Sequence, residues 1–122
     1  MKIFLATKNP GKISEFKEIL SGLSVDLVTY NDLEIPDVEE TGSTFVENAI
    51  LKARSASETT KLPSIADDSG IEVDFLKGRP GVWSARYASV DATNDENNLK
   101  LLSELQGVAE NERGACYRCV IV

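Results

Sequence analysis

The chain has 122 residues, of which 42% are apolar and 27% are charged, a composition typical of globular proteins. Its 13 basic and 20 acidic residues give a net charge of −7, which argues against binding to a nucleic-acid backbone. No apolar run approaches membrane-spanning length, and Met1–Ala6 is too short for a signal peptide. We therefore expect a single domain over residues 1–122, located in the cytoplasm, without nucleic-acid or membrane partners.

The two cysteines and the absence of histidine limit the chemistry further. Cys116 and Cys119 lie an odd number of residues apart in an alternating segment, which places them on opposite faces of a strand. We expect buried, reduced thiols and no disulfide or metal pair. Without histidine, imidazole-dependent zinc sites and histidine-activated nucleophiles are excluded. Carboxylates acting with a hard cation are the chemistry that this inventory leaves.

The first elements are a strand over residues 2–7 and, after a short loop, a helix in which Ile13, Phe16, Ile19 and Leu20 repeat at helical spacing. Ile3, Phe4 and Leu5 form a continuous apolar run, as in a strand covered on both faces. The intervening loop, residues 7–12, contains a glycine and two lysines before a helix start, where backbone amides and the helix dipole favour phosphate. The loop lacks the Walker A spacing, and Asn-Pro-Gly is also an ordinary turn sequence. Both phosphate binding and a plain turn therefore fit this segment.

A second strand is expected over residues 25–28, and a second helix follows a capping box formed by Thr44 and Glu47. The small apolar face of that helix also carries Asn48 and Lys52, one turn apart. Lys52 either extends past the core to reach solvent or points with Asn48 into a cleft.

Residues 67–70, Asp-Asp-Ser-Gly, follow a short apolar run. Buried carboxylates need a partner, so an acidic pair after a strand faces a cation or a cleft. Asp, Ser and Gly are also common in turns, and the residues alone favour a turn slightly over a metal site. Further strands are expected at residues 71–75 and 115–122. A capping box of Thr93 and Glu96 opens a helix with Leu99, Leu102 and Leu105 on one side.

Four segments in this order resemble the inosine triphosphate pyrophosphatase family, which includes the bacterial XTP/dITP diphosphatases. They are Thr7-x-Asn9-x-x-Lys12, Glu40-Thr41-Gly42-x-Thr44-Phe45-x-Glu47-Asn48-Ala49, Ala66-Asp67-Asp68-Ser69-Gly70 and Pro80-Gly81-x-x-Ser84-Ala85-Arg86-Tyr87. The resemblance implies an α/β fold: an elongated mixed sheet flanked by helices, two-lobed with a central cleft. It also implies a homodimer.

The resemblance further implies Mg²⁺-dependent hydrolysis of deaminated purine nucleoside triphosphates (ITP, dITP, XTP) to monophosphate and pyrophosphate. Family members continue beyond this point with segments that contact the base, so the C-terminal part is expected to be missing here. The strand that ends at Val122 would then expose an edge that invites pairing with another chain. Trp83 stands where the family usually has tyrosine.

Residue roles follow from the resemblance and from the chemistry of each group. Asp68 is the expected general base and, with Glu40, a ligand of Mg²⁺, which needs only one or two carboxylates besides phosphates. The expected second shell is Glu39 (an alternative ligand to Glu40), Glu47, Asn48 and Asp67. The expected substrate-binding residues are Thr7, Lys8, Asn9, Pro10, Gly11, Lys12, Lys52 and Ser69.

Overall fold

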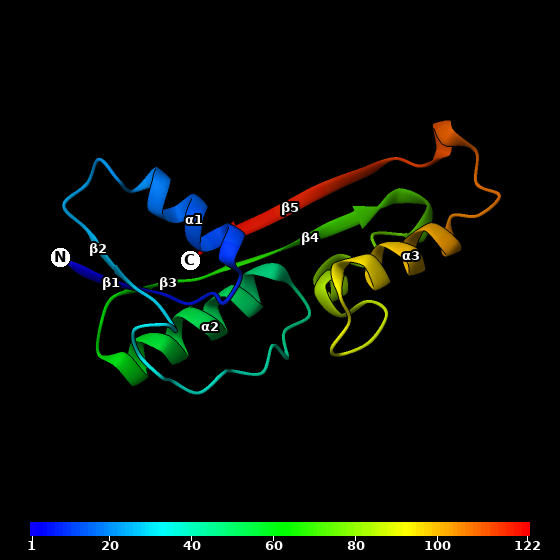
Figure 1. The fold of residues 1–122 in the computed structure, drawn as a ribbon. Coiled ribbons are helices and arrows are strands. Elements are labelled where there is room, and N and C mark those ends of the chain that lie inside the picture. Colours follow the sequence, from blue (N-terminus) through cyan, green and yellow to red (C-terminus); the bar gives the residue numbers. More distant parts are fainter. The chain divides into compact units, whose positions relative to one another are not determined.

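The computed structural model describes residues 1–122, which form two compact units. One unit comprises Met1–Asp67 with Val120–Val122, and the other comprises Asp68–Cys119. The chain contains a parallel sheet, a second pair of strands and three α-helices, so the predicted α/β class is confirmed (Figure 1).

The sheet of the first unit has three parallel strands in the order β2-β1-β3. They are β1 (Lys2–Leu5), β2 (Asp26–Val28) and β3 (Ser64–Ile65). The central strand β1 carries the apolar run, and its residues Phe4 and Leu5 are completely buried. This burial confirms the prediction of a strand covered on both faces.

Two helices accompany this sheet, α1 (Pro10–Ile19) and α2 (Phe45–Thr60), and Figure 1 draws them on opposite sides of the strands. The predicted capping box at the start of α2 is present in both directions between Thr44 and Glu47. Small side chains on α2, Ala53 and Ala56, pack with Phe4 in the core of this unit. Their size lets the helix approach the sheet closely, which fixes the position of the polar residues on the same face.

The strand β4 (Asp67–Val73) pairs with β5 (Ala115–Ile121). The backbone amide of Asp74 donates to the Gly114 carbonyl, and Ala66 and Val122 exchange two bonds of 2.9 Å, so the pair is antiparallel. The expected turn at Asp-Asp-Ser-Gly is therefore wrong, because the backbone continues through Ser69 and Gly70 as strand. Pairing with β5 gives the backbone N–H and C=O groups hydrogen-bond partners, which a turn would have supplied from neighbouring residues.

The second unit places short 3-10 helices at Asp74–Leu76, Gly81–Arg86 and Glu110–Glu112, together with α3 (Asn94–Glu104). The capping box of Thr93 and Glu96 is confirmed. Of the three leucines expected along one side, Leu105 is buried with Val73 and Leu76, whereas Leu99 and Leu102 are exposed. Polar bonds supplement this small core, since buried Asn97 bonds the backbone of Ala85 and Ala88.

The prediction of buried thiols is wrong, because Cys116 and Cys119 are both exposed. Neither core cluster contains a residue of β5, so its side chains stay accessible although its backbone is paired. Neither cysteine is part of a disulfide. No helix of the chain combines the length and the apolar character needed to cross a bilayer.

Candidate functional site

The loop after β1 is shaped by the side chains of its own residues. Thr7 accepts a hydrogen bond from the Asn9 amide at 3.2 Å, and the Asn9 side chain caps α1 by accepting from the amides of Gly11 (2.9 Å) and Lys12 (3.3 Å). Pro10 occupies the first helical turn, where its missing N–H costs nothing. Asn9 already accepts hydrogen bonds from two of the terminal amides of α1, so those two amides are not available to an anion. The lysine side chains of this loop are the groups that an anion can contact more readily.

A tight turn before α2 positions Glu40. The Gly42 amide donates to Asn48 Oδ1 at 2.8 Å, and Asn48 is completely buried. A Cβ atom at position 42 would lie 2.6 Å from that oxygen and 2.7 Å from the Cβ of Glu47, so only glycine fits without displacement. Glu47 accepts from the backbone amides of Ser43 and Thr44, which fixes the other side of the turn. These hydrogen bonds hold the pKa of the Glu47 carboxyl below its ordinary value.

A cavity of about 320 Å³ lies beside the loop that follows β1, within the first unit. It receives two lysines and two carboxylates: Lys8 from the loop, Lys52 from α2, and Asp37 and Glu40 from the segment between β2 and α2. The remaining lining residues are Ala6, Thr7, Tyr30 and Val38. Lys52 thus reaches a cavity, as one of its two predicted placements had it, whereas Asn48, expected to point there with it, is buried and does not line this cavity.

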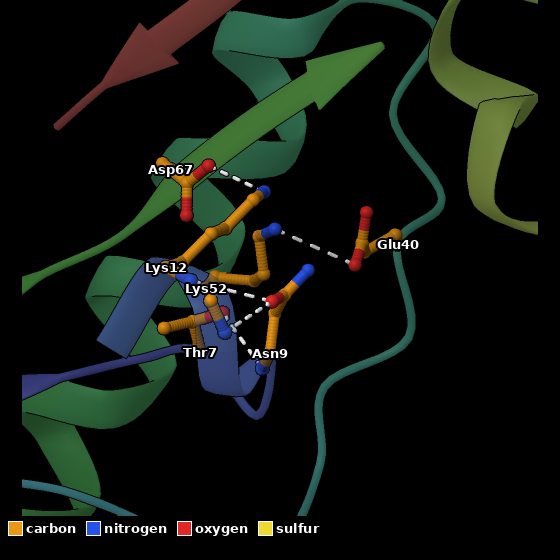
Figure 2. A network of polar contacts seen from close by, with 7 residues as sticks. Thr7, Asn9, Lys12, Glu40, Lys52 and Asp67 are labelled. Carbon is orange, nitrogen blue, oxygen red and sulfur yellow. Dashed lines mark hydrogen bonds and ion pairs between the residues drawn. The ribbon is translucent and has the colours of Figure 1, made fainter. Parts of the chain in front are cut away.

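Each of the three lysines of this site lies next to a different carboxylate. Lys8 Nζ is 2.6 Å from Asp37 Oδ2, and Lys52 Nζ is 3.5 Å from Glu40 Oε1. Lys12 Nζ is 2.5 Å from Asp67 Oδ2 (Figure 2). The last pair has a topological cause. Lys12 and Asp67 both follow the carboxyl ends of neighbouring parallel strands, β1 and β3, which is where α/β sheets place their ligands.

Asp67 is the most deeply buried acid of the site, with 3% of its surface exposed. Its Oδ2 atom faces Lys12, but its Oδ1 atom is buried without a hydrogen-bond partner. A buried carboxylate oxygen normally has a partner, so this atom is an acceptor suited to a water or a ligand group. The structure thus gives Asp67 a direct partner in Lys12.

Asp68 and Ser69 follow Asp67 on β4 and begin the second unit. The Asp68 side chain is buried, with 6% exposed. Successive strand residues point to opposite faces, so Asp67 and Asp68 serve different surroundings. Pro10 and Gly11 lie in the first turn of α1, and Glu39 is exposed next to the half-buried Glu40.

The residues present have the donor chemistry of a magnesium site with few protein ligands. No group of three or more histidine, cysteine, aspartate or glutamate side chains comes together in a way that could hold a metal ion. Mg²⁺ does not require such a group, because it is usually held by one or two carboxylates and substrate phosphates. Glu40, a carboxylate that lines the cavity, fits this description.

Two lining residues that the sequence does not single out are Tyr30 and Asp37. Burial, and secondarily the Asp37 charge, raise the pKa of the Tyr30 phenol, whereas Lys8 lowers it. The Tyr30 ring packs edge-on against Phe4, with ring centroids 5.2 Å apart, and Lys8 Nζ lies 5.1 Å from its centroid. The segment from Tyr30 to Asp37 has no periodicity, so no sequence signal marks these two residues.

The fold and the site define an α/β protein with lysine–carboxylate pairs at the carboxyl end of a parallel sheet. Comparison with known proteins identifies its family. The profile of the Ham1 family matches residues 3–122. A protein of Yersinia pseudotuberculosis named dITP/XTP pyrophosphatase is 55% identical over 121 residues, which are 99% of this chain and 61% of that protein. The chain belongs to the Ham1 family.

Solved structures agree with this assignment. A HAM1 protein from Coxiella burnetii superimposes with a TM-score of 0.89 at 45% identity, covering 99% of this chain and 61% of that one. The Ham1 protein of Staphylococcus aureus gives a TM-score of 0.84 at 43% identity, with coverages of 99% and 62%. The resemblance drawn from the four motifs is thereby confirmed. The chain spans about three-fifths of the length of these relatives.

Proposed function

We propose that the chain carries the phosphate-binding and catalytic part of a nucleoside triphosphate pyrophosphatase that acts on deaminated purine nucleotides such as dITP, ITP and XTP. The observation that carries this proposal is the cavity where Lys8 and Lys52 meet Glu40, next to the loop that follows β1. The name of the relative from Yersinia pseudotuberculosis supports the substrate class.

The triphosphate would be held by the loop and by α2. Lys8, Lys12 and Lys52 supply positive charge, and hydroxyl and amide groups of Thr7 and Asn9 supply hydrogen bonds. Pro10 and Gly11 shape the turn that presents these groups, and Ser69 would contact the nucleotide from β4. Lysine reads phosphate as a point charge, so these contacts give affinity without base selectivity.

The reaction would be an in-line displacement in which water attacks the α-phosphorus. Asp68 accepts the proton of that water, the bond from the α-phosphorus to the bridging oxygen breaks, and pyrophosphate leaves. The lysines stabilise the charge that moves onto the leaving pyrophosphate.

Glu40 and Asp68 would hold a divalent cation, with Mg²⁺ as the expected ion and Glu39 as the alternative to Glu40. When bound, such a cation neutralises phosphate charge and lowers the pKa of water. The cavity supports a need for it. Two lysines and two carboxylates line the cavity, so its formal charge is zero, and a bound cation would add to its attraction for a polyanion.

A second candidate is a nucleotide-binding module that grips polyphosphate without turnover. This candidate is kept because the matched part is 61% of the Yersinia relative, whose name applies to that whole protein. Location in the cytoplasm and a homodimeric state stay predictions from the sequence.

Pyrophosphate release with dITP, XTP and dATP separates the two candidates. The assay is run with Mg²⁺ on this chain and, as a positive control, on the full-length Yersinia relative. Release from dITP and XTP well above release from dATP supports the enzyme. Binding of dITP without release, while the control is active, supports the binding module and overturns the proposed activity of this chain.

A further inference from the structure

We propose that Asp37 is an exchangeable counter-ion of Lys8: it pairs with the lysine ammonium at the cavity and gives it up to the oxygens of an incoming polyphosphate. This inference rests on the proposed function, since it concerns how the same cavity accepts its anion. It assigns a role to Asp37, which lies outside every motif discussed above and would act as a positioning residue for Lys8.

Exposure decides which of the three lysine–carboxylate pairs can exchange. The side chains of Lys8 and Asp37 are 58% and 63% exposed. Those of Lys52 and Glu40 are only 16% and 28% exposed, and Asp67, the partner of Lys12, is 3% exposed. An exposed pair contributes little, because water solvates both groups when they separate. Separating Lys12 from Asp67 would leave a buried carboxylate without its cation, which is far more costly. Lys12 is therefore fixed, and Lys8 is the lysine that can change partner.

The position of Asp37 suits competition with an anion. Asp37 and Lys8 line the same cavity, together with Lys52 and Glu40. A polyphosphate that enters the cavity brings oxygens of the same charge as the Asp37 carboxylate within reach of the same ammonium group. Like charges repel at short range, so phosphate binding to Lys8 displaces Asp37 instead of adding to it.

Tyr30 keeps Lys8 at the cavity while its partner changes. The ammonium group lies over the ring of Tyr30, and the ring is itself fixed against buried Phe4. Such a cation–π contact does not depend on Asp37. Burial also raises the pKa of the Tyr30 phenol, so it stays neutral and adds no competing charge. Lys8 thus has one neutral support that persists and one charged partner that can leave.

The test measures binding of inorganic tripolyphosphate to this chain by calorimetry, at low salt and without divalent cation. Asp37→Asn removes the competing charge, and Glu34→Gln is the matched control. Glu34 is exposed in the same segment, does not line the cavity, and loses the same charge. Asp37→Asn should tighten binding by up to about fivefold, the equivalent of the roughly 1 kcal/mol ascribed to an exposed pair. Glu34→Gln should change binding far less, because Glu34 does not line the cavity and so does not compete for the Lys8 ammonium.

A double-mutant cycle with Lys8→Ala identifies the partner. In the Lys8→Ala background the gain from Asp37→Asn should disappear, because no ammonium remains to be released. A gain that persists there, equal effects of Asp37→Asn and Glu34→Gln, or no binding of tripolyphosphate would each overturn the proposal. Tripolyphosphate carries no nucleoside, so the cycle is independent of turnover. An intact cycle without pyrophosphate release from dITP leaves the exchange standing and refutes only the enzymatic activity.

Discussion

Gly42→Ala tests the turn that positions Glu40. The added Cβ would lie 2.6 Å from Asn48 Oδ1 and 2.7 Å from the Cβ of Glu47, well inside ordinary contact. Asn48 is completely buried, so it cannot move aside into water, and its 2.8 Å bond from the Gly42 amide must stretch or break. Overpacking costs about 1–3 kcal/mol and a lost buried hydrogen bond costs a similar amount, so we expect the free energy of unfolding to fall by about 2 kcal/mol.

The assay is urea unfolding followed by circular dichroism, with the slope compared between variants so that a change in midpoint reports stability. Gly22→Ala is the matched control, because a Cβ there meets nothing within 4 Å and the backbone has no positive φ. The control should be neutral or stabilised by up to about 1 kcal/mol. If the two variants unfold within about 0.5 kcal/mol of each other, the scatter usual for surface changes, the close packing inferred at Gly42 is refuted.

Three more predictions use residues of the same site. Asp68→Asn should reduce pyrophosphate release about 10²–10⁴-fold, as loss of a general base does. The control Asp26→Asn, at the exposed end of β2, should not reduce it. Equal rates for the two variants would show that Asp68 is not the general base. Lys12→Ala should lower the free energy of unfolding by about 1–3 kcal/mol, less than for a fully buried pair because Lys12 is partly exposed. Lys8→Ala should lower it by less than about 1 kcal/mol, because that pair is exposed. The reverse order in urea unfolding would contradict this ranking of the two pairs. The pKa of Glu47 is lowered from 4.5 by hydrogen bonds from Ser43 and Thr44, so its contribution to stability is present above pH 4.5 and is lost as pH falls through the folded pKa. Glu47→Gln should therefore flatten the decline of stability below about pH 4.5, and an unchanged pH profile would show that this carboxylate contributes nothing.

The sequence predicted the elements that depend on interactions between residues close together in the chain. Both capping boxes, at Thr44 and Thr93, form as predicted, because an N-cap side chain and a glutamate three residues later satisfy each other without help from the rest of the chain. The apolar face of α2 is also as predicted, since its alanines and Phe45 recur at helical spacing. Lys52 on that face reaches the cavity, which spacing alone left open.

Features that depend on distant partners were not predictable in this way. Ser69 and Gly70 favour a turn by their own propensities, and only pairing with β5 makes them strand. Burial of the cysteines depends on what covers β5, which no pattern within that strand reveals. Asp37 pairs with Lys8 across 29 residues, in a segment without periodicity, so spacing could not connect them.

Ala66 is held by two hydrogen bonds to Val122, so the strand that carries Asp67 and Asp68 gains its partner only late in synthesis. Ala66 immediately precedes Asp67 and Asp68, and its strand partner is 56 residues further along the chain (122 − 66). At about 5–20 residues per second, a ribosome needs roughly 3–11 s to add those residues. During that interval the lysine loop and β1 already exist while the strand that carries the carboxylates still lacks its neighbour. A nascent chain can therefore form its lysine loop well before the two aspartates are held in place by β5.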